Sequence, residues 1–271
     1  MENNKKIQVG KRITDPILKE KKDYIVGEKN KEDRKNLIIL PNKGKAVFVG
    51  DTHGDFQSTQ VVIKNFLKEN IYLVFLGDYV DRGPFSKENI DYLLELNSKN
   101  ENIILLAGNH EMFPIIELTP AEFWESLSEE EFNYYKEKFL KFPLVVSGNG
   151  FLALHGVIPN VDNLEDINKI LPCDEDWMRI IWGDFREKEG EFLGDFLGRP
   201  KYGKDYFEKV MKKLEKNVLI RSHDPISPER MFDNRCLTIF TSSAYKPERK
   251  VAILDLEKEI KNIDDIEIIS F

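Results

Sequence analysis

The sequence has 271 residues, of which 41% are hydrophobic and 32% are charged, and its formal net charge is −8. A chain of this length can form one large α/β domain or two small ones, with enough apolar residues for a sizeable core. The acidic balance argues against a general affinity for nucleic acid or for anionic membranes, but it leaves room for an anionic substrate held by metals or a few arginines.

The composition also limits where the protein resides. No stretch of the sequence approaches the roughly 18 apolar residues of a membrane span, and the N-terminal residues contain no apolar signal core. The two cysteines, Cys173 and Cys236, form no CxxC pair, which fits a reducing compartment. We therefore expect a cytoplasmic protein with no membrane partner.

The chain begins with a lysine- and glutamate-rich segment, residues 1–36, which we expect to be an accessory arm ahead of one domain over residues 37–271. Residues 37–40 and 46–50 are apolar and flank the turn-forming sequence PNKGK. Turn residues between two apolar runs predict a β-hairpin.

The next part of the chain alternates between helical and strand-like patterns. A helix with one apolar face follows residue 54, and Ser58 is its expected cap. Residues 71–77 and 102–108 are apolar enough for buried strands, and a second helix starting at Ser86 lies between them. The order β-α-β-α-β is typical of a layered α/β fold.

Residues 113–142 interrupt this alternation and are expected to form a helical insert. Within it, the sequences TPAE and SEEE each have the pattern of a capping box. Two strands around a Gly-Asn-Gly turn are expected at 145–156. The remaining expected elements are helices at 163–182 and 204–217 and strands at 217–223, 237–240 and 251–257.

Side chains of the metal-binding type follow the expected strands at the points where the strands end. All four histidines of the sequence have this position, and they are His53, His110, His155 and His223. A single histidine after a strand is more often an ordinary core or surface residue, and a Gly-Asp pair is more often an ordinary turn. Because ligands of α/β sheets bind at the carboxyl ends of strands, the recurrence favours one shared site.

The types of donor indicate the class of site. Aspartate and asparagine oxygens combined with imidazole nitrogens, and no thiolate, suit Mn, Fe, Zn or Co rather than a cysteine-type structural zinc site. Six such groups exceed what one catalytic ion with an open position needs. They match two ions that share a bridging carboxylate.

Three motifs give the chain a family resemblance: GDTHG at 50–54, GDYVDRG at 77–83 and GNHE at 108–111. Together they resemble the calcineurin-like metallophosphoesterases, and the arginine of the second motif resembles the phosphoprotein phosphatase (PPP) type. Weaker resemblances follow in the family's order, and they are HGVIP (155–159), IIWGDF (180–185), RSH (221–223) and SSAYK (242–246). The resemblance covers roughly residues 46–256.

The resemblance implies an α/β fold with a central two-sheet β-sandwich flanked by helices, over residues 37–271. It also implies a metal-dependent phosphomonoesterase that uses a hydroxide bridging two divalent ions for in-line attack on phosphorus. The expected substrate and partner is a phosphorylated protein, modified on serine or threonine. Mn is the ion expected in vitro, with Fe, Zn or Co as alternatives.

Individual roles are carried over by the same resemblance. Asp51 and His53 correspond to ligands of the first ion, and Asp78 corresponds to the bridging carboxylate. The second ion is assigned Asn109, His155 and His223. The remaining roles are a general acid, His110, oriented by Asp81, two phosphate clamps, Arg82 and Arg199, and a residue of the rim, Tyr245. The neighbouring Asp81 is expected to raise the fraction of His110 that stays protonated, because an anion favours the imidazolium.

The chain departs from the family pattern around the site. Ala107, Phe185, Ala244 and Lys246 stand where the family has arginine, proline, asparagine and cysteine. These changes leave the metal donors in place but alter the rim. A dinucleoside polyphosphate hydrolase or a polynucleotide phosphatase therefore remains an alternative, although acidity disfavours a nucleic acid partner. A non-catalytic scaffold is disfavoured because no donor is missing, and a regulatory subunit is left open.

Overall fold

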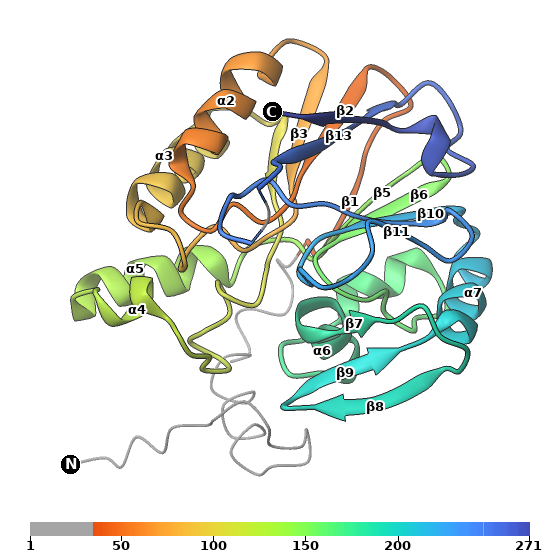
Figure 1. The fold of residues 1–271 in the computed structure, drawn as a ribbon. Helices are drawn as coiled ribbons and strands as arrows, with labels where there is room; N and C mark the ends of the chain where they lie inside the picture. The colour runs from red at the N-terminus through yellow and green to blue at the C-terminus, as the bar shows by residue number, and fades with distance from the viewer. Residues whose placement is uncertain (1–34, 246) are drawn as a thin grey trace.

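Two large β-sheets pack face to face in the computed structural model, which describes residues 35–245 and 247–271 (Figure 1). Most of the accessory arm expected at 1–36 lies outside the described residues and stays a prediction. The five-stranded sheet has the order β14 (Glu267–Ser270), β13 (Lys250–Asp255), β2 (Lys45–Val49), β3 (Ile71–Phe75) and β4 (Ile103–Leu105). The six-stranded sheet has the order β1 (Leu37–Ile39), β5 (Val145–Gly148), β6 (Phe151–Leu154), β10 (Val218–Arg221), β12 (Cys236–Thr238) and β11 (Arg230–Met231).

Alternation along the strands divides the core into two parts. Phe48 of β2 points into the space between the sheets, where it meets Phe151 of β6 with ring centroids 5.6 Å apart. Its neighbours Val47 and Val49 point to the opposite face, which the helices cover. Side chains of successive strand residues point to opposite faces, so both faces of the five-stranded sheet are buried.

Helices flank the two sheets, as the resemblance implied, and this two-sheet α/β arrangement is confirmed. Figure 1 shows α2 and α3 beside the five-stranded sheet, and α6, α7 and a small three-stranded sheet beside the six-stranded one. The helices are α2 (Phe56–Phe66), α3 (Ser86–Lys99), α4 (Glu122–Glu125), α5 (Glu129–Phe139), α6 (Glu175–Trp182) and α7 (Lys204–Lys213). The small sheet has the order β7 (Asp184–Phe185), β9 (Arg199–Tyr202) and β8 (Phe192–Phe196), and two 3-10 helices, η2 (Leu164–Lys169) and η3 (Ile263–Asp265), complete the described elements.

Parallel pairing brings several strand ends to one edge. In the five-stranded sheet, Val49 pairs with Phe75 and Phe75 pairs with Leu105, so the loops after β2, β3 and β4 leave the sheet together. In the six-stranded sheet, β6 and β10 are parallel neighbours, so their carboxyl ends also lie side by side. An isolated bridge between Asp51 and Phe240 joins the two sets of loops.

The hairpin expected from residues 37–40 and 46–50 is wrong. β1 pairs in parallel with β5, whereas β2 pairs with β3 and β13 in the other sheet. The turn signal itself is real, because Gly44 has a φ of 82°, a left-handed conformation that glycine adopts readily. The chain uses this turn to cross from one sheet to the other.

Of the three helix caps expected from the sequence, one is confirmed and two are wrong. The capping box at Ser128 is confirmed, since its hydroxyl accepts from the Glu131 N–H and the Glu131 carboxylate accepts from the Ser128 N–H. The cap of α2 is Asp55 and not Ser58, whose own N–H donates to the Asp55 carboxylate. No side chain caps α4, so the box expected just before it is wrong.

Among the described residues, no helix combines the length and the apolar character that crossing a membrane requires.

Candidate metal centre

The candidate centre lies where loops from both sheets meet. Asp51, His53, Asp78 and Asn109 follow strands of the five-stranded sheet, and His155 and His223 follow β6 and β10 of the six-stranded sheet. All six side chains are buried. The Ser222 hydroxyl accepts from the Asp51 N–H at 2.9 Å, and the Asp51 carboxylate accepts from the His223 N–H at 3.3 Å. The two sheets are thus hydrogen-bonded to each other at the site.

The backbone is strained at several of these positions. His53, Asp78, Asp81, Arg82 and His223 all have φ between 42° and 74°, in the left-handed region that non-glycine residues rarely adopt. Such conformations persist when the surrounding structure holds them, and they concentrate at functional sites. The turns aim these side chains inward from the strand ends.

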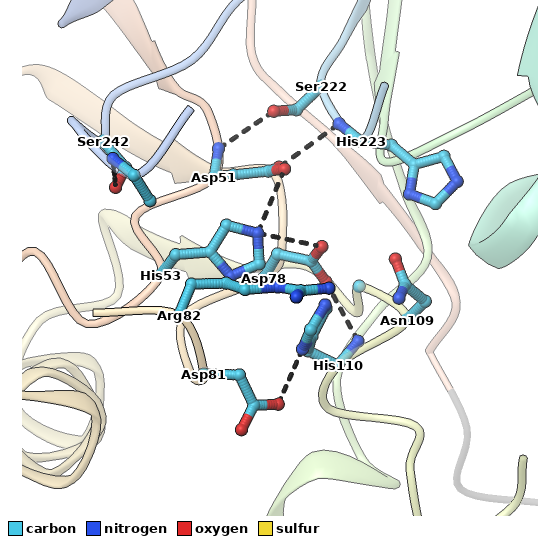
Figure 2. A network of polar contacts seen from close by, with 12 residues as sticks. Asp51, His53, Asp78, Asp81, Arg82, Asn109, His110, Ser222, His223 and Ser242 are labelled. Atoms are coloured by element: carbon cyan, nitrogen blue, oxygen red, sulfur yellow. Dashed lines mark hydrogen bonds and ion pairs between the residues drawn. The ribbon is translucent and has the colours of Figure 1, made fainter. Parts of the chain in front are cut away.

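Asp78 occupies the middle of the cluster (Figure 2). Its Oδ2 lies 3.6 Å from Nε2 of His53, and its Oδ1 lies 3.5 Å from Nε2 of His155. Two groups of potential ligand atoms, each with all atoms within 4.8 Å of one another, share this aspartate. One group contains His53 and His110, and the other contains His155 and His223.

Hydrogen bonds fix how two of the imidazoles face Asp78. Nδ1 of His53 lies 2.9 Å from the Val80 carbonyl, and Nδ1 of His155 lies 2.9 Å from the Leu76 carbonyl. A carbonyl oxygen only accepts, so each Nδ1 carries the proton and each Nε2 presents a lone pair to the carboxylate. This arrangement of unprotonated donors is the one that metal-binding histidines adopt.

The electrostatics of the cluster fit a bound cation. Burial lowers the pKa of His53, His155 and His223 well below the usual value, so these imidazoles are neutral. Burial raises the pKa of Asp51 to about 7, and burial with the nearby Asp51 raises the pKa of Asp78. Oδ2 of Asp51 and Nδ1 of His223 are buried without a hydrogen-bond partner. A bound metal ion would neutralise the neighbouring carboxylates and would coordinate the oxygen and nitrogen atoms that lack a hydrogen-bond partner.

His110 lies beside this cluster and is held by Asp81. Its Nδ1 is 2.6 Å from Oδ2 of Asp81, and its ring centroid is 4.7 Å from that of His53. Burial, followed by the charge of Arg82, lowers the pKa of His110 to about 3, while burial raises the pKa of Asp81 to about 7. Desolvation has the largest effect on the pKa of His110, and the expected contribution of Asp81 to its protonation stays a prediction.

The two arginines differ in how they are held. Arg82 is exposed, and its guanidinium carbon lies 5.9 Å from the ring centroid of Tyr245, which in turn lies 5.2 Å from the His53 ring. The guanidinium of Arg199 donates from Nε and Nη2 to the Asp184 carboxylate, at 3.1 and 2.7 Å. Its Nη2 also lies 2.9 Å from Nε2 of His223. Both arginines therefore border the cluster, but Arg199 is already paired.

Glu111 is a supporting residue whose role was not predicted. Its buried carboxylate accepts from three backbone N–H groups, those of Asp78, Tyr79 and Gly108, at 2.8, 2.9 and 3.1 Å. It thereby ties the loop after β3 to the loop after β4. Gly108 is required there, because an added Cβ would lie 2.3 Å from Oδ1 of Asp78. Glu111 belongs to the motif GNHE, but two of the N–H groups that donate to it belong to the segment after β3, so the motif alone did not indicate this role.

Two further supports come from the helical insert. The N–H of Phe123 donates to Oδ1 of Asp81 at 2.8 Å, and the indole N–H of Trp124 donates to the His110 carbonyl at 2.8 Å. Asp81 thus accepts one hydrogen bond from α4 on Oδ1 and faces His110 with Oδ2. The helical segment expected at 113–142 thus contributes to the site, a role that was not predicted.

Comparison with known proteins gives the site a context. The family model described as calcineurin-like phosphoesterase matches residues 44–227. A curated relative, serine/threonine-protein phosphatase T of Aspergillus oryzae, is 28% identical over 278 residues, which cover 96% of this chain and 57% of the relative. The chain therefore spans little more than half the length of that relative.

Solved structures show the same fold. A serine/threonine phosphatase from Saccharomyces cerevisiae with similarity to human phosphatase PP5 superposes with a TM-score of 0.71, at 22% identity, covering 94% of this chain and 87% of that one. A putative diadenosine tetraphosphatase superposes with a TM-score of 0.53, at 14% identity, covering 87% of this chain and 97% of that one.

Proposed function

The chain belongs to the calcineurin-like phosphoesterase family, and from this premise we propose that it is a metal-dependent phosphomonoesterase acting on phosphoserine or phosphothreonine in proteins. The observation that carries the proposal is the position of Asp78 between two pairs of neutral imidazoles. One imidazole of each pair, His53 or His155, is oriented by a backbone carbonyl. The similarity to a curated serine/threonine phosphatase supports the choice of substrate. We propose residues 37–271 as the catalytic unit, with 113–142 as its insert.

The residues proposed to hold two divalent ions are Asp51 and His53 for one, Asn109, His155 and His223 for the other, and Asp78 for both. Such ions, when bound, supply positive charge for the phosphoryl oxygens and lower the pKa of an attacking water. Mn is the ion that we propose for assays in vitro, with Fe, Zn or Co as the alternatives, because oxygen and imidazole donors suit all of them.

Arg82 and Arg199 are proposed to bind the phosphoryl group. A guanidinium can donate two parallel hydrogen bonds to phosphate oxygens, and it remains charged at all relevant pH values. Arg82 is exposed and available for this contact. Arg199 is oriented by Asp184 beside His223 and would share its remaining N–H groups with the substrate. Tyr245, next to both His53 and Arg82, is proposed to border the bound group.

His110 is proposed to protonate the leaving oxygen from Nε2. Asp81 holds the opposite ring nitrogen, Nδ1, and so fixes the direction in which Nε2 points. Burial disfavours the charged imidazole, but the negative charge of a bound phosphoryl group favours it. The proton is therefore supplied where the leaving alkoxide needs it, after the substrate has entered.

One set of assays tests the function. Purified protein with Mn²⁺ is given a phosphoserine peptide, a diadenosine polyphosphate and a 3′-phosphorylated oligonucleotide. We expect the phosphopeptide to have the highest kcat/KM, and EDTA to remove the activity until Mn²⁺ is restored. Preferred turnover of either nucleotide substrate would contradict the proposal and favour the alternative enzymes.

A matched pair of variants tests the site. Asp78→Asn is expected to lose activity with the circular dichroism spectrum unchanged, whereas Asp162→Asn, which alters a side chain that is 91% exposed, is expected to keep it. Full activity in the Asp78 variant would contradict the site.

We also propose a cytoplasmic location. The buried thiol of Cys236 forms no disulfide, which supports a reducing compartment. A phosphorylated protein is the proposed partner. Cell fractionation with antibodies to the protein would test the location.

A further inference from the structure

The hairpin of β8 and β9 exposes three large apolar side chains, and one of its residues, Arg199, contacts His223 of the candidate centre. Phe192, Phe196 and Leu197 are 60%, 61% and 60% exposed. Single exposed apolar residues are common, but several that adjoin a site on one short segment mark a surface that binds something. Figure 1 shows this hairpin at the lower border of the molecule, outside the six-stranded sheet.

The register of the hairpin places Phe196 on the same face as Arg199. These two residues are directly opposite each other in the antiparallel pair, and directly opposite residues project to the same side. Lys201, two residues after Arg199, confirms the direction, because its Nζ lies 4.9 Å from the centroid of the Phe196 ring. Arg199 reaches His223 from this face, so Phe196 adjoins the candidate phosphate site.

The other face of the hairpin is turned toward the body of the protein. Phe192 is opposite Tyr202, and their ring centroids are 5.7 Å apart. Tyr202 is buried and packs on Tyr206 of α7, with centroids 4.5 Å apart. The register of the pair shifts between Phe192 and Asp195, so Phe192 and Phe196, although four residues apart, lie on opposite faces of the strand. The two side chains are equal in residue type and similar in exposure.

The tip of the hairpin is held in a defined conformation. Leu197 and Gly198, the two turn residues, have φ of 54° and 80°, which is the pattern of a tight two-residue hairpin turn. The Asp195 carboxylate accepts from the Gly198 N–H at 2.9 Å. Asp184 anchors the adjoining Arg199. A surface that is ordered before binding loses little conformational entropy when it binds.

We propose that Phe196 and Leu197 bind an apolar side chain of the phosphoprotein substrate, a few residues from its phosphorylated residue. The inference rests on the proposed function and adds a specificity determinant to it. Leu197 is two residues from Arg199, a chain distance of at most about 7 Å, and an extended peptide advances about 3.3–3.6 Å per residue. A side chain two to four positions from the phosphorylated residue matches this reach.

The charges around the tip indicate which kind of peptide segment would bind there. The charge of Arg199 is paired with Asp184, and the Asp195 carboxylate accepts from the Gly198 N–H. The positive charge next to the exposed rings is therefore that of Lys201, whose Nζ lies over the Phe196 ring. A peptide segment with an acidic residue beside the apolar one complements this combination of positive charge and exposed carbon. The occupant is thus an extended, acidic and apolar segment of a phosphorylated polypeptide, continuous with the candidate phosphate site.

Peptide kinetics test the proposal with Phe192 as the matched control. The substrates are phosphoserine peptides that carry leucine or alanine two to four positions to either side of the phosphoserine, and p-nitrophenyl phosphate, which is too small to extend to the tip. We expect wild-type protein to prefer one leucine peptide over its alanine counterpart about tenfold in kcat/KM. Phe196→Ala should abolish this preference, and Phe192→Ala should keep it.

Three outcomes would overturn the proposal. The first is equal turnover of the leucine and alanine peptides by the wild type, which would leave the proposed function intact. The second is an equal effect of the two phenylalanine variants, and the third is a matching loss of p-nitrophenyl phosphate turnover in Phe196→Ala. If the wild type cleaved p-nitrophenyl phosphate but no phosphopeptide, the proposed function would fail together with this inference.

Discussion

The segment that supports His110 and the segment that supports Arg199 contrast in how they use apolar side chains. In α4, Phe123 and Trp124 are 3% exposed and lie among other aromatic rings. In the β8–β9 hairpin, residues of similar size are about 60% exposed. Both segments lie between the motifs that carry the candidate ligands, and both contact a residue of the candidate site.

The contrast shows two ways to position a polar group. Trp124 is surrounded by Phe113, stacked at 5.6 Å, and by Phe132 and Phe139, so packing holds its N–H against the His110 carbonyl. Arg199 is instead held by an ion pair to Asp184. Because polar contacts and a tight turn order the hairpin, its apolar side chains are left available for a ligand.

The largest expected effect concerns the group that α4 supports. His110→Asn should lower kcat by about 10²–10⁴-fold, since it removes the proposed general acid. Metal analysis should still find two ions per chain. If the variant bound one ion fewer, His110 would be identified as a metal ligand, a role that its position near His53 and Asp78 allows.

Truncation of an aromatic side chain should lower the free energy of unfolding much more in α4 than in the β8–β9 hairpin. Trp124→Ala should lower the free energy of unfolding by about 3–5 kcal/mol, because it leaves a cavity among buried rings. Phe196→Ala, at an exposed position, should change it by less than about 0.5 kcal/mol. Urea denaturation of both variants measures the difference, and equal losses would remove the contrast.

The ion pair of the hairpin is expected to act on substrate binding. Asp184→Asn removes the charge that orients Arg199, so KM for aryl phosphate should rise about tenfold, as expected for a charge-assisted hydrogen bond. Asp195→Asn is the control on the same hairpin, because its carboxylate accepts from a turn N–H. A similar KM in both variants would argue against an orienting role for Asp184.

The smallest effect isolates a single hydrogen bond. Trp124→Phe keeps most of the ring but removes the N–H that the His110 carbonyl accepts. We expect a stability loss of about 1 kcal/mol, together with a several-fold lower kcat and an unchanged KM. Stopped-flow or steady-state assays on p-nitrophenyl phosphate would detect the split, and a change in KM alone would contradict a positioning role.

The convergence of the candidate metal donors could be predicted because each follows its strand within a few residues. Asp51 and His155, for example, sit at strand ends, and parallel pairing brings such ends together. The partner of β1 could not be predicted in this way. Its apolar residues fit either sheet, and only tertiary packing places it against β5.

Supporting contacts were harder to predict than donors. Nothing in the sequence near Glu111 indicates that its carboxylate accepts from Tyr79, 32 residues away. The pKa of His110 depends on burial by segments distant in sequence, which a charge argument based on the neighbouring Asp81 does not include. A sequence motif shows which chemical groups are present. The burial and the hydrogen-bond partners of each group depend on the whole fold.

The division of the candidate ligands between two sheets has a thermodynamic consequence. Four of them follow strands of one sheet, and His155 and His223 follow strands of the other. A cation that contacts both sets would act as a cross-link between the layers of the sandwich, so its binding energy would also resist their separation. Binding of the cation and association of the two sheets would thus be linked, so each would strengthen the other.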